Sequence, residues 1–223
     1  MIGGATLVLF YESPRLSRDL DLLALPGPLP KIEDVLAVVR SRIQPLAEIF
    51  GLGQLEFQQN VTNPDFVKLW VLANQKALFS IDLTKIGGNV LENQIVRKII
   101  ADTPEKTVLT LNASYLLFQK CQTFLGRRHL KARDAFDIHF LLSRGAQLDK
   151  TLHTHLEDFI VMKELDKELI QERIEAVTAK LCRVELRPVL PLPLFEQLEK
   201  EEFKAIRQSL RIVLSEWLAK GHR

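Results

Sequence analysis

The sequence predicts an α+β protein in which a small mixed, largely antiparallel sheet with flanking helices is followed by a helical domain. Apolar and polar residues alternate in several segments before residue 85, whereas from residue 91 onward apolar residues recur at the spacing of amphipathic helices. The chain has 223 residues, of which 47% are hydrophobic, so it is long enough for two small domains with buried cores. The change of pattern at Gly87-Gly88 predicts one domain at 1–88 and a second at 89–223.

In the first domain each expected element follows from the spacing of its apolar residues. The elements are, in order, a helix at 4–11, a strand at 19–24, a helix at 32–50, and strands at 54–62, 66–73 and 77–84. Asn63-Pro64-Asp65 and Asn74-Gln75-Lys76 separate the last three strands, and residues of these types favour hairpin turns. The sheet is therefore expected to be mostly antiparallel.

The second domain is expected to contain only helices. They are placed at 91–100, 112–124, 133–143, 151–162, 167–184 and 195–220. Proline and glycine interrupt the helical pattern near Pro104, Gly126 and Gly145 and in the proline-rich run at 188–193.

Two aspartates lie on one side of the strand at 19–24. Side chains of a strand alternate between its faces, so Asp19 and Asp21 project together, with Leu20 and Leu22 on the opposite face. Neighbouring carboxylates repel each other unless a cation or a proton lies between them, and oxygen ligands suit a divalent metal. The spacing therefore predicts a site for Mg²⁺, or Mn²⁺, with Asp19 and Asp21 as ligands.

A glycine pair, Gly3-Gly4, opens the short helix that precedes this strand. Glycines let backbone N–H groups approach a phosphate at a helix N-terminus, where the helix dipole favours an anion. The glycine pair and the aspartate pair together make half of a nucleotide-transfer site.

Asp82 is the candidate third carboxylate. In the strand at 77–84 it shares a face with Ser80, while its apolar neighbours point the other way. A carboxylate in a central strand is costly to bury unless it is paired or bound to metal. If this strand lies beside the strand of Asp19 and Asp21, three carboxylates converge. Such a group can hold a divalent cation against the phosphates of a nucleotide and activate an attacking hydroxyl.

Several other classes of site and location are disfavoured. The sequence has no GxxxxGK[ST] loop of a P-loop ATPase, and no HExxH motif or Cys/His cluster that would indicate zinc. Its net charge of +2 is close to neutral, so any surface that binds nucleic acid must be local. No apolar stretch approaches the roughly 20 residues that span a bilayer. We therefore expect a cytoplasmic protein without a membrane partner.

A second informative region runs from Lys120 to Asp137. It contains the densest basic cluster of the chain, made of Arg127, Arg128, Lys131 and Arg133. This cluster predicts either a contact with a phosphate backbone or a solvated basic loop. Asp134 and Asp137 are three residues apart and share a helical face, from which they would pair with the neighbouring arginines or position Lys120.

Together these motifs resemble the AbiEii-type nucleotidyltransferase toxin family. The resemblance spans roughly residues 3–142, and it rests on Gly3-Gly4-Ala5-Thr6-Leu7, Arg15-Leu16-Ser17-Arg18-Asp19-Leu20-Asp21, Ile81-Asp82, and Lys120 through Arg133-Asp134-Ala135-Phe136-Asp137. It implies a polymerase-β-like nucleotidyltransferase core at 1–88 followed by a helical domain. It also implies the toxin half of an abortive-infection toxin–antitoxin pair, with a cognate antitoxin as a partner.

The resemblance further implies a reaction and roles for individual residues. NMP would pass from an NTP to an acceptor hydroxyl, with RNA, and tRNA in particular, as the acceptor. The catalytic carboxylates and metal ligands would be Asp19, Asp21 and Asp82. The nucleotide would be bound by Gly3, Gly4, Thr6, Arg15, Ser17, Lys120 and Asp134. The RNA backbone would be held by Arg127, Arg128, Lys131 and Arg133.

Two alternatives remain open. A nucleotidyltransferase that modifies a small molecule, such as an aminoglycoside, would use the same three aspartates but would need an acidic acceptor cleft. A degenerate, non-enzymatic nucleotidyltransferase fold would instead bind a partner protein or nucleic acid. The second alternative is favoured by the position of Gly3 almost at the first residue, because the core is then expected to lack the element that precedes the glycine pair.

Overall fold

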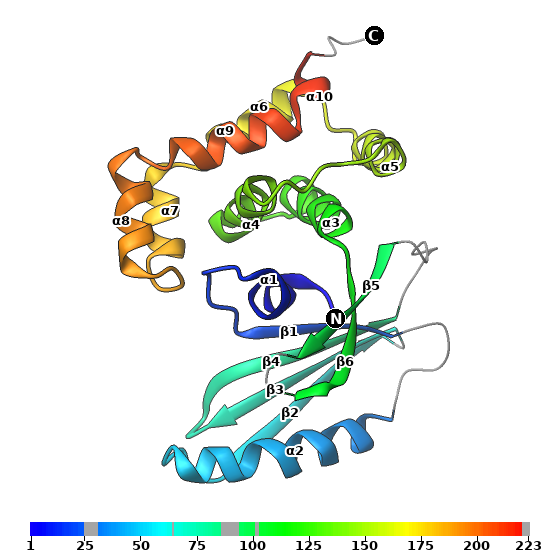
Figure 1. The fold of residues 1–223 in the computed structure, drawn as a ribbon, viewed down its shortest axis with the longest axis vertical. Coiled ribbons are helices and arrows are strands. Elements are labelled where there is room, and N and C mark those ends of the chain that lie inside the picture. Colours follow the sequence, from blue (N-terminus) through cyan, green and yellow to red (C-terminus); the bar gives the residue numbers. More distant parts are fainter. Residues whose placement is uncertain (25–30, 64, 86–93, 101–102, 220–223) are drawn as a thin grey trace. The chain divides into compact units, whose positions relative to one another are not determined.

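The computed structural model describes residues 1–24, 31–63, 65–85, 94–100 and 103–219, which divide into two compact units (Figure 1). The first unit contains Met1–Leu9 and Ser17–Thr110, and the second contains Phe10–Leu16 and the chain from Leu111 onward. The boundary that the sequence suggests, at Gly87-Gly88, lies outside the described residues.

The first unit is built on a four-stranded mixed sheet. Its strands are β1 (Asp19–Ala24), β2 (Leu55–Asn63), β3 (Phe66–Ala73) and β4 (Lys76–Lys85), in the order β1-β4-β3-β2. Strand β1 runs parallel to β4, whereas β4 with β3 and β3 with β2 are antiparallel. The predicted α+β class and mostly antiparallel sheet are confirmed.

A long helix, α2 (Ile32–Ile49), lies along one face of this sheet (Figure 1). The apolar side chains that pack together there are Leu20, Leu22, Val67, Leu69, Ile81 and Leu83 of the strands and Ile32, Val35, Leu36 and Val39 of α2. Burial of this face fixes which way each strand turns its side chains. The aspartates of β1 and β4 alternate with these leucines and isoleucines, so they lie on the face away from α2.

The hairpin between β3 and β4 sets the register of the sheet. It turns at Asn74 and Gln75, whose φ angles of 49° and 62° are those of a tight turn that suits the twist of antiparallel strands. An irregularity between Val71 and Leu72 then shifts the pairing by one residue.

Two further strands, β5 (Ile95–Ile100) and β6 (Thr103–Leu111), form a separate two-stranded sheet in the first unit. The expected helix at 91–100 is therefore wrong over its described part, and the sequence analysis expects no strand at 103–111. The segment is rich in isoleucine, valine and threonine, whose branched side chains favour strands over helices.

From Ala113 to Ala219 the regular elements of the second unit are all helices. They are α3 (Ala113–Gly126), α4 (Ala132–Ser143), α5 (Lys150–Met162), α6 (Lys167–Glu175), α7 (Ala179–Leu186), α8 (Leu192–Lys200), α9 (Lys204–Val213) and α10 (Ser215–Ala219). Helix α4 packs against α3, α7 and α9. None of the helices described here is long and apolar enough to cross a membrane.

The helices expected at 112–124, 133–143 and 151–162 are confirmed, but the two longest helices expected in this part of the chain, at 167–184 and 195–220, are each divided. Thr178 interrupts the segment 167–184, because its hydroxyl accepts a hydrogen bond from N of Leu181 and so begins a new helix. The segment 195–220 is interrupted at Phe203, because its backbone is left-handed, with φ of 57°, and again at Leu214, between α9 and α10. Helical periodicity continues through these breaks, which is why the sequence does not reveal them.

The short helix α1 (Gly3–Tyr11) precedes β1, and its last two residues belong to the second unit. Its start is fixed within the first unit, because N of Ile2 donates a 2.9 Å hydrogen bond to O of Asp21. The structure thus places the predicted glycine pair beside the predicted aspartate pair.

Candidate functional site

The sheet face away from α2 carries polar side chains at matching positions of three adjacent strands. In the parallel pair of β1 and β4, Asp19 lies opposite Ser80 and Asp21 lies opposite Asp82. In the antiparallel pair of β3 and β4, Lys68 lies opposite Asp82. The buried Oγ of Ser80 donates a 2.8 Å hydrogen bond to Oδ1 of Asp19. The three aspartates predicted as one group therefore share one face of two neighbouring strands.

Gly3 lies directly against Asp21. Its φ is 75°, and a β-carbon built there would overlap Oδ2 of Asp21 and lie 2.8 Å from its Cγ. Glycine is thus required at this position for its backbone conformation and for the space that it leaves. The carboxylate of Asp21 consequently stands at the first turn of α1, where the sequence predicts a phosphate cradle.

Gly3→Ala is expected to destabilise the protein more than Gly51→Ala. Both glycines have positive φ, but a β-carbon at Gly51 would meet nothing within 4 Å. Each alanine should cost about 1–2 kcal/mol for the left-handed backbone, and the clash with Asp21 should add to that cost only at Gly3. Urea unfolding of the two variants measures the difference. Equal losses of stability would show that Asp21 does not press against Gly3.

The three aspartates are suitable ligands for a divalent cation, but their carboxylates do not form a complete metal site. Carboxylate oxygens are preferred ligands of Mg²⁺, and Oδ1 of Asp82 is buried. Nζ of Lys68, however, lies 2.9 Å from this oxygen and donates to Oδ2 over 2.9 Å. Within the described residues, no three His, Cys, Asp or Glu side chains lie close enough together to hold a metal ion. Asp19, Asp21 and Asp82 are therefore candidate ligands by the type of their donor atoms alone, and Lys68 already supplies one positive charge to Asp82.

Three other predicted nucleotide contacts lie in α1 or near β1. Gly4 and Thr6 are buried, and Oγ1 of Thr6 makes no hydrogen bond to any residue that the structure describes. Oγ of Ser17 donates a 3.3 Å hydrogen bond to O of Asp19. Their contacts with a nucleotide stay predictions.

Thr6→Val is expected to raise the free energy of unfolding. Valine has the shape of threonine without its hydroxyl, and the buried hydroxyl of Thr6 has no hydrogen-bond partner in the described part of the chain. Removing an unsatisfied buried polar group should stabilise the fold by about 1 kcal/mol or more. Thermal or urea unfolding measures the change, and a loss of stability would mean that the hydroxyl has a partner in solution.

In the second unit a buried carboxylate on α4 binds two cations. Nε and Nη2 of Arg15 donate to Oδ1 and Oδ2 of Asp137 over 2.8 and 3.0 Å, and Nζ of Lys120 lies 2.8 Å from Oδ2. The side chain of Asp137 is fully buried. Burial raises its pKa, but Lys120 and Arg15 outweigh that effect, so the pKa of Asp137 is lowered. Asp137 is therefore ionised at neutral pH.

Asp134 extends this group of charges. Nζ of Lys120 lies 3.7 Å from Oδ1 of Asp134, and Nε of Arg127 lies 3.2 Å from Oδ2. The sequence-based expectation that Asp134 and Asp137 pair with arginines or position Lys120 is confirmed. Arg15 is 4% exposed, and its Nη1 donates a hydrogen bond to O of Leu16. Because its guanidinium also binds Asp137, Arg15 connects the segment 10–16 to α4. Nucleotide contacts by Arg15, Lys120 and Asp134 stay predictions.

The basic cluster is partly neutralised by neighbouring carboxylates. Arg127 pairs with Asp134, and Nζ of Lys131 lies 3.3 Å from Oε1 of Glu185. Arg128, in contrast, is exposed and has no ion pair or hydrogen bond to the described residues. Two of the four basic residues of the cluster, Arg127 and Lys131, are therefore already paired with carboxylates, which reduces the positive charge that the cluster offers to an RNA backbone. Its contact with RNA stays a prediction.

Comparison with known families gives a match to the nucleotidyl transferase AbiEii toxin of Type IV toxin–antitoxin systems, over residues 1–218. The chain belongs to the AbiEii family. The match reaches into α10, well beyond the roughly 140 residues that carry the resemblance in the sequence. Membership implies a nucleotidyltransferase toxin of a toxin–antitoxin system, and hence a cognate antitoxin. No curated protein matches this chain significantly.

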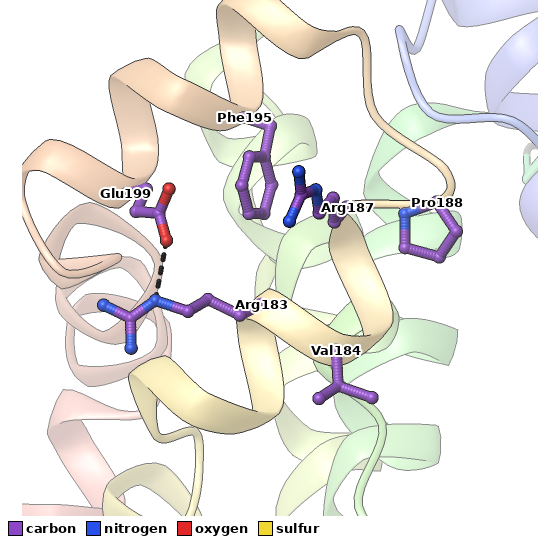
Figure 2. Close-up of a pocket in the computed structure, with 6 residues that line it drawn as sticks. All are labelled: Arg183, Val184, Arg187, Pro188, Phe195 and Glu199. Atoms are coloured by element: carbon purple, nitrogen blue, oxygen red, sulfur yellow. Dashed lines mark hydrogen bonds and ion pairs between the residues drawn. The ribbon is translucent and has the colours of Figure 1, made fainter.

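This AbiEii protein also has an open groove between α7 and α8, with a volume of about 500 Å³ (Figure 2). It is lined by Arg183, Val184, Arg187, Pro188, Phe195 and Glu199. Nε of Arg183 lies 2.6 Å from Oε1 of Glu199. The lining contains none of the predicted site residues and only one carboxylate, which is already paired. We assign no catalytic role to this groove.

Two contacts of the AbiEii site residues are not evident from the sequence: the pairing of Lys68 with Asp82, and the identity of the cations that meet Asp137. The alternating burial of β3 places Lys68 on the polar face of the sheet, which is a signal in the sequence, but its pairing with Asp82 depends on the register.

Proposed function

We propose that this AbiEii protein transfers NMP from an NTP to a hydroxyl of RNA, with tRNA as the acceptor, and releases pyrophosphate. The observation that carries the proposal is the placement of Asp21 opposite Asp82 on parallel strands, with Asp19 on the same face and Gly3 against Asp21. Family membership supports nucleotidyl transfer, and the carboxylate face supports Mg²⁺ or Mn²⁺ as the cofactor.

In the proposed reaction the oxygen of the acceptor hydroxyl bonds to the α-phosphorus of the NTP. The bond from that phosphorus to the oxygen bridging to the β-phosphate breaks, and the bonding electron pair leaves with pyrophosphate. We assign the hydroxyl proton to the carboxylate of Asp82, because it shares a sheet face with Asp19 and Asp21. Backbone N–H groups at the start of α1 would bind phosphate oxygens. A divalent cation at Asp19 and Asp21 would neutralise phosphate charge.

The choice of RNA as the acceptor rests on the second unit. The segment 127–133 carries four basic residues, of which Arg128 is exposed and makes no ion pair with the described chain. Cations on a surface segment attract a phosphate backbone. We place the protein in the cytoplasm, where NTPs and tRNA are available, with its antitoxin as a partner.

The test is to incubate the purified protein with each α-labelled NTP and Mg²⁺, in parallel with total tRNA, an aminoglycoside panel and no added acceptor. An Asp19→Asn/Asp21→Asn variant serves as the control. Label that appears in tRNA with the unmodified protein alone would support the proposal and identify the nucleotide. Label in the aminoglycosides would favour the small-molecule alternative. No transfer and no NTP binding would favour a non-enzymatic binding protein.

A further inference from the structure

Lys68 brings a positive charge into the group of carboxylates. Its Nζ lies 2.9 Å from both oxygens of Asp82, and the two side chains are only 23% and 17% exposed. The same Nζ lies 4.5 Å from the centre of the Trp70 ring. Lys68 and Trp70 are two residues apart on β3, so they share the face that carries the aspartates.

The charge of Lys68 offsets part of the repulsion among the aspartates of the sheet. Asp21 and Asp82 lie directly opposite each other on adjacent strands, and Asp19 is on the same face. Like charges at facing positions of a sheet destabilise it unless a nearby cation offsets them. Lys68 approaches Asp82 from β3, on the side of β4 opposite to β1. Within the described residues, the ammonium of Lys68 is the cation that is ion-paired to Asp82.

We propose that Lys68 is the resident counter-ion of the metal site, a positioning residue that holds Asp82 and releases it when a divalent cation binds. This inference rests on the proposed function, since it assumes that Asp82 joins Asp19 and Asp21 around a cation. The ring of Trp70 provides the released ammonium with a second favourable position, which it already partly occupies.

The proposal has a consequence for metal affinity. A metal cation that enters the site must break the Lys68–Asp82 ion pair. The measured affinity for metal is therefore lower than it would be if Asp82 had no ion pair to lose. A variant without the ammonium should bind metal more tightly, although it loses one contact of the folded protein. Trp70 should report the exchange, because the charge beside its ring changes position when metal binds.

The experiment measures Mn²⁺ and Mg²⁺ binding by calorimetry, and tryptophan fluorescence, in a Trp217→Phe background that leaves Trp70 as the only tryptophan. The variants are Lys68→Met, Lys68→Arg and, as a matched control for net charge, Lys76→Met at an exposed position of β4. We expect Lys68→Met to bind metal about fivefold to tenfold more tightly, the range for a half-buried ion pair. Lys68→Arg and Lys76→Met should stay close to the unmodified protein.

Metal should change Trp70 emission in the unmodified protein and in Lys76→Met, but not in Lys68→Met. Equal or weaker metal binding by Lys68→Met would overturn the role of Lys68 and leave the proposed metal site intact. If neither the unmodified protein nor Lys68→Met binds metal, the metal dependence of the proposed function fails, and the role of Lys68 fails with it.

Discussion

Asp137→Asn is expected to lower the free energy of unfolding by about 3–5 kcal/mol, the cost of removing one partner of a buried ion pair. The amide has the size of the carboxylate but leaves the buried Arg15 and the mostly buried Lys120 without the anion that binds both. The loss should extend beyond α4, because Arg15 ties the segment 10–16 to that helix. Urea unfolding followed by the fluorescence of Trp217, which is buried in α10 of the same unit, measures the change.

Glu175→Gln is the matched control. It also removes a carboxylate from an arginine, but Arg211 and Glu175 are about half exposed, and pairs of that kind contribute less than about 1 kcal/mol. If Asp137→Asn does not fold, Arg15→Gln, which keeps the Lys120–Asp137 pair, replaces it and should also cost more than the control. A loss similar to that of Glu175→Gln would contradict the buried ion pair.

The contribution of Asp137 is expected to disappear in acid. Its pKa in the folded protein is lower than the ordinary value of 3.8, because Lys120 and Arg15 outweigh its burial. A carboxyl of lowered pKa stabilises the fold fully above its unfolded pKa and loses that contribution as the pH falls through the folded pKa. The stability difference between the unmodified protein and Asp137→Asn should therefore be constant near neutrality and shrink below about pH 4. A difference that is independent of pH down to acid unfolding would contradict the lowered pKa.

Asp21→Asn is expected to reduce nucleotide transfer by about 10²–10³-fold or more, the range for loss of one electrostatic contact that matters in the transition state. Asparagine has nearly the volume of aspartate, so the packing against Gly3 is kept, but the negative charge that would hold a cation beside the phosphates is lost. Folding should be preserved, because one fewer carboxylate on that face also reduces repulsion with Asp82. Initial rates of label transfer from an α-labelled NTP measure the effect.

Asp65→Asn provides the control for this prediction. Asp65 is 67% exposed and lies next to β3, so the variant changes net charge equally without touching the carboxylate face. It should transfer nucleotide at the rate of the unmodified protein. Unchanged transfer by Asp21→Asn would exclude the carboxylate pair from the chemistry.

Most of the sheet could be predicted because its strands have one buried face. Alternation in β1, β3 and β4 separates the leucines and isoleucines that meet α2 from the aspartates, and Asn74 and Gln75 mark the hairpin. The strands β5 and β6 were missed because Ile95, Val96 and Ile99 also fit a helical spacing. Local periodicity does not distinguish the two structures there, and the pairing of β5 with β6 decides between them.

The candidate site could be predicted only in part, because it depends on register. Counted from the turn at Asn74 and Gln75, regular pairing would put Lys68 opposite Ile81. The irregularity between Val71 and Leu72 shifts it to Asp82, and a one-residue shift exchanges the faces of a strand. The burial of Arg15 could not be predicted from the sequence either, because its partner Asp137 lies 122 residues away along the chain.

The most direct test of the account is to locate a bound metal in crystals of the protein grown with Mn²⁺ and a non-hydrolysable NTP. The account predicts an anomalous peak within coordination distance of Asp19 and Asp21, with the phosphates of the nucleotide at the start of α1. A nucleotide bound elsewhere, or a metal that contacts neither aspartate, would contradict the proposed site.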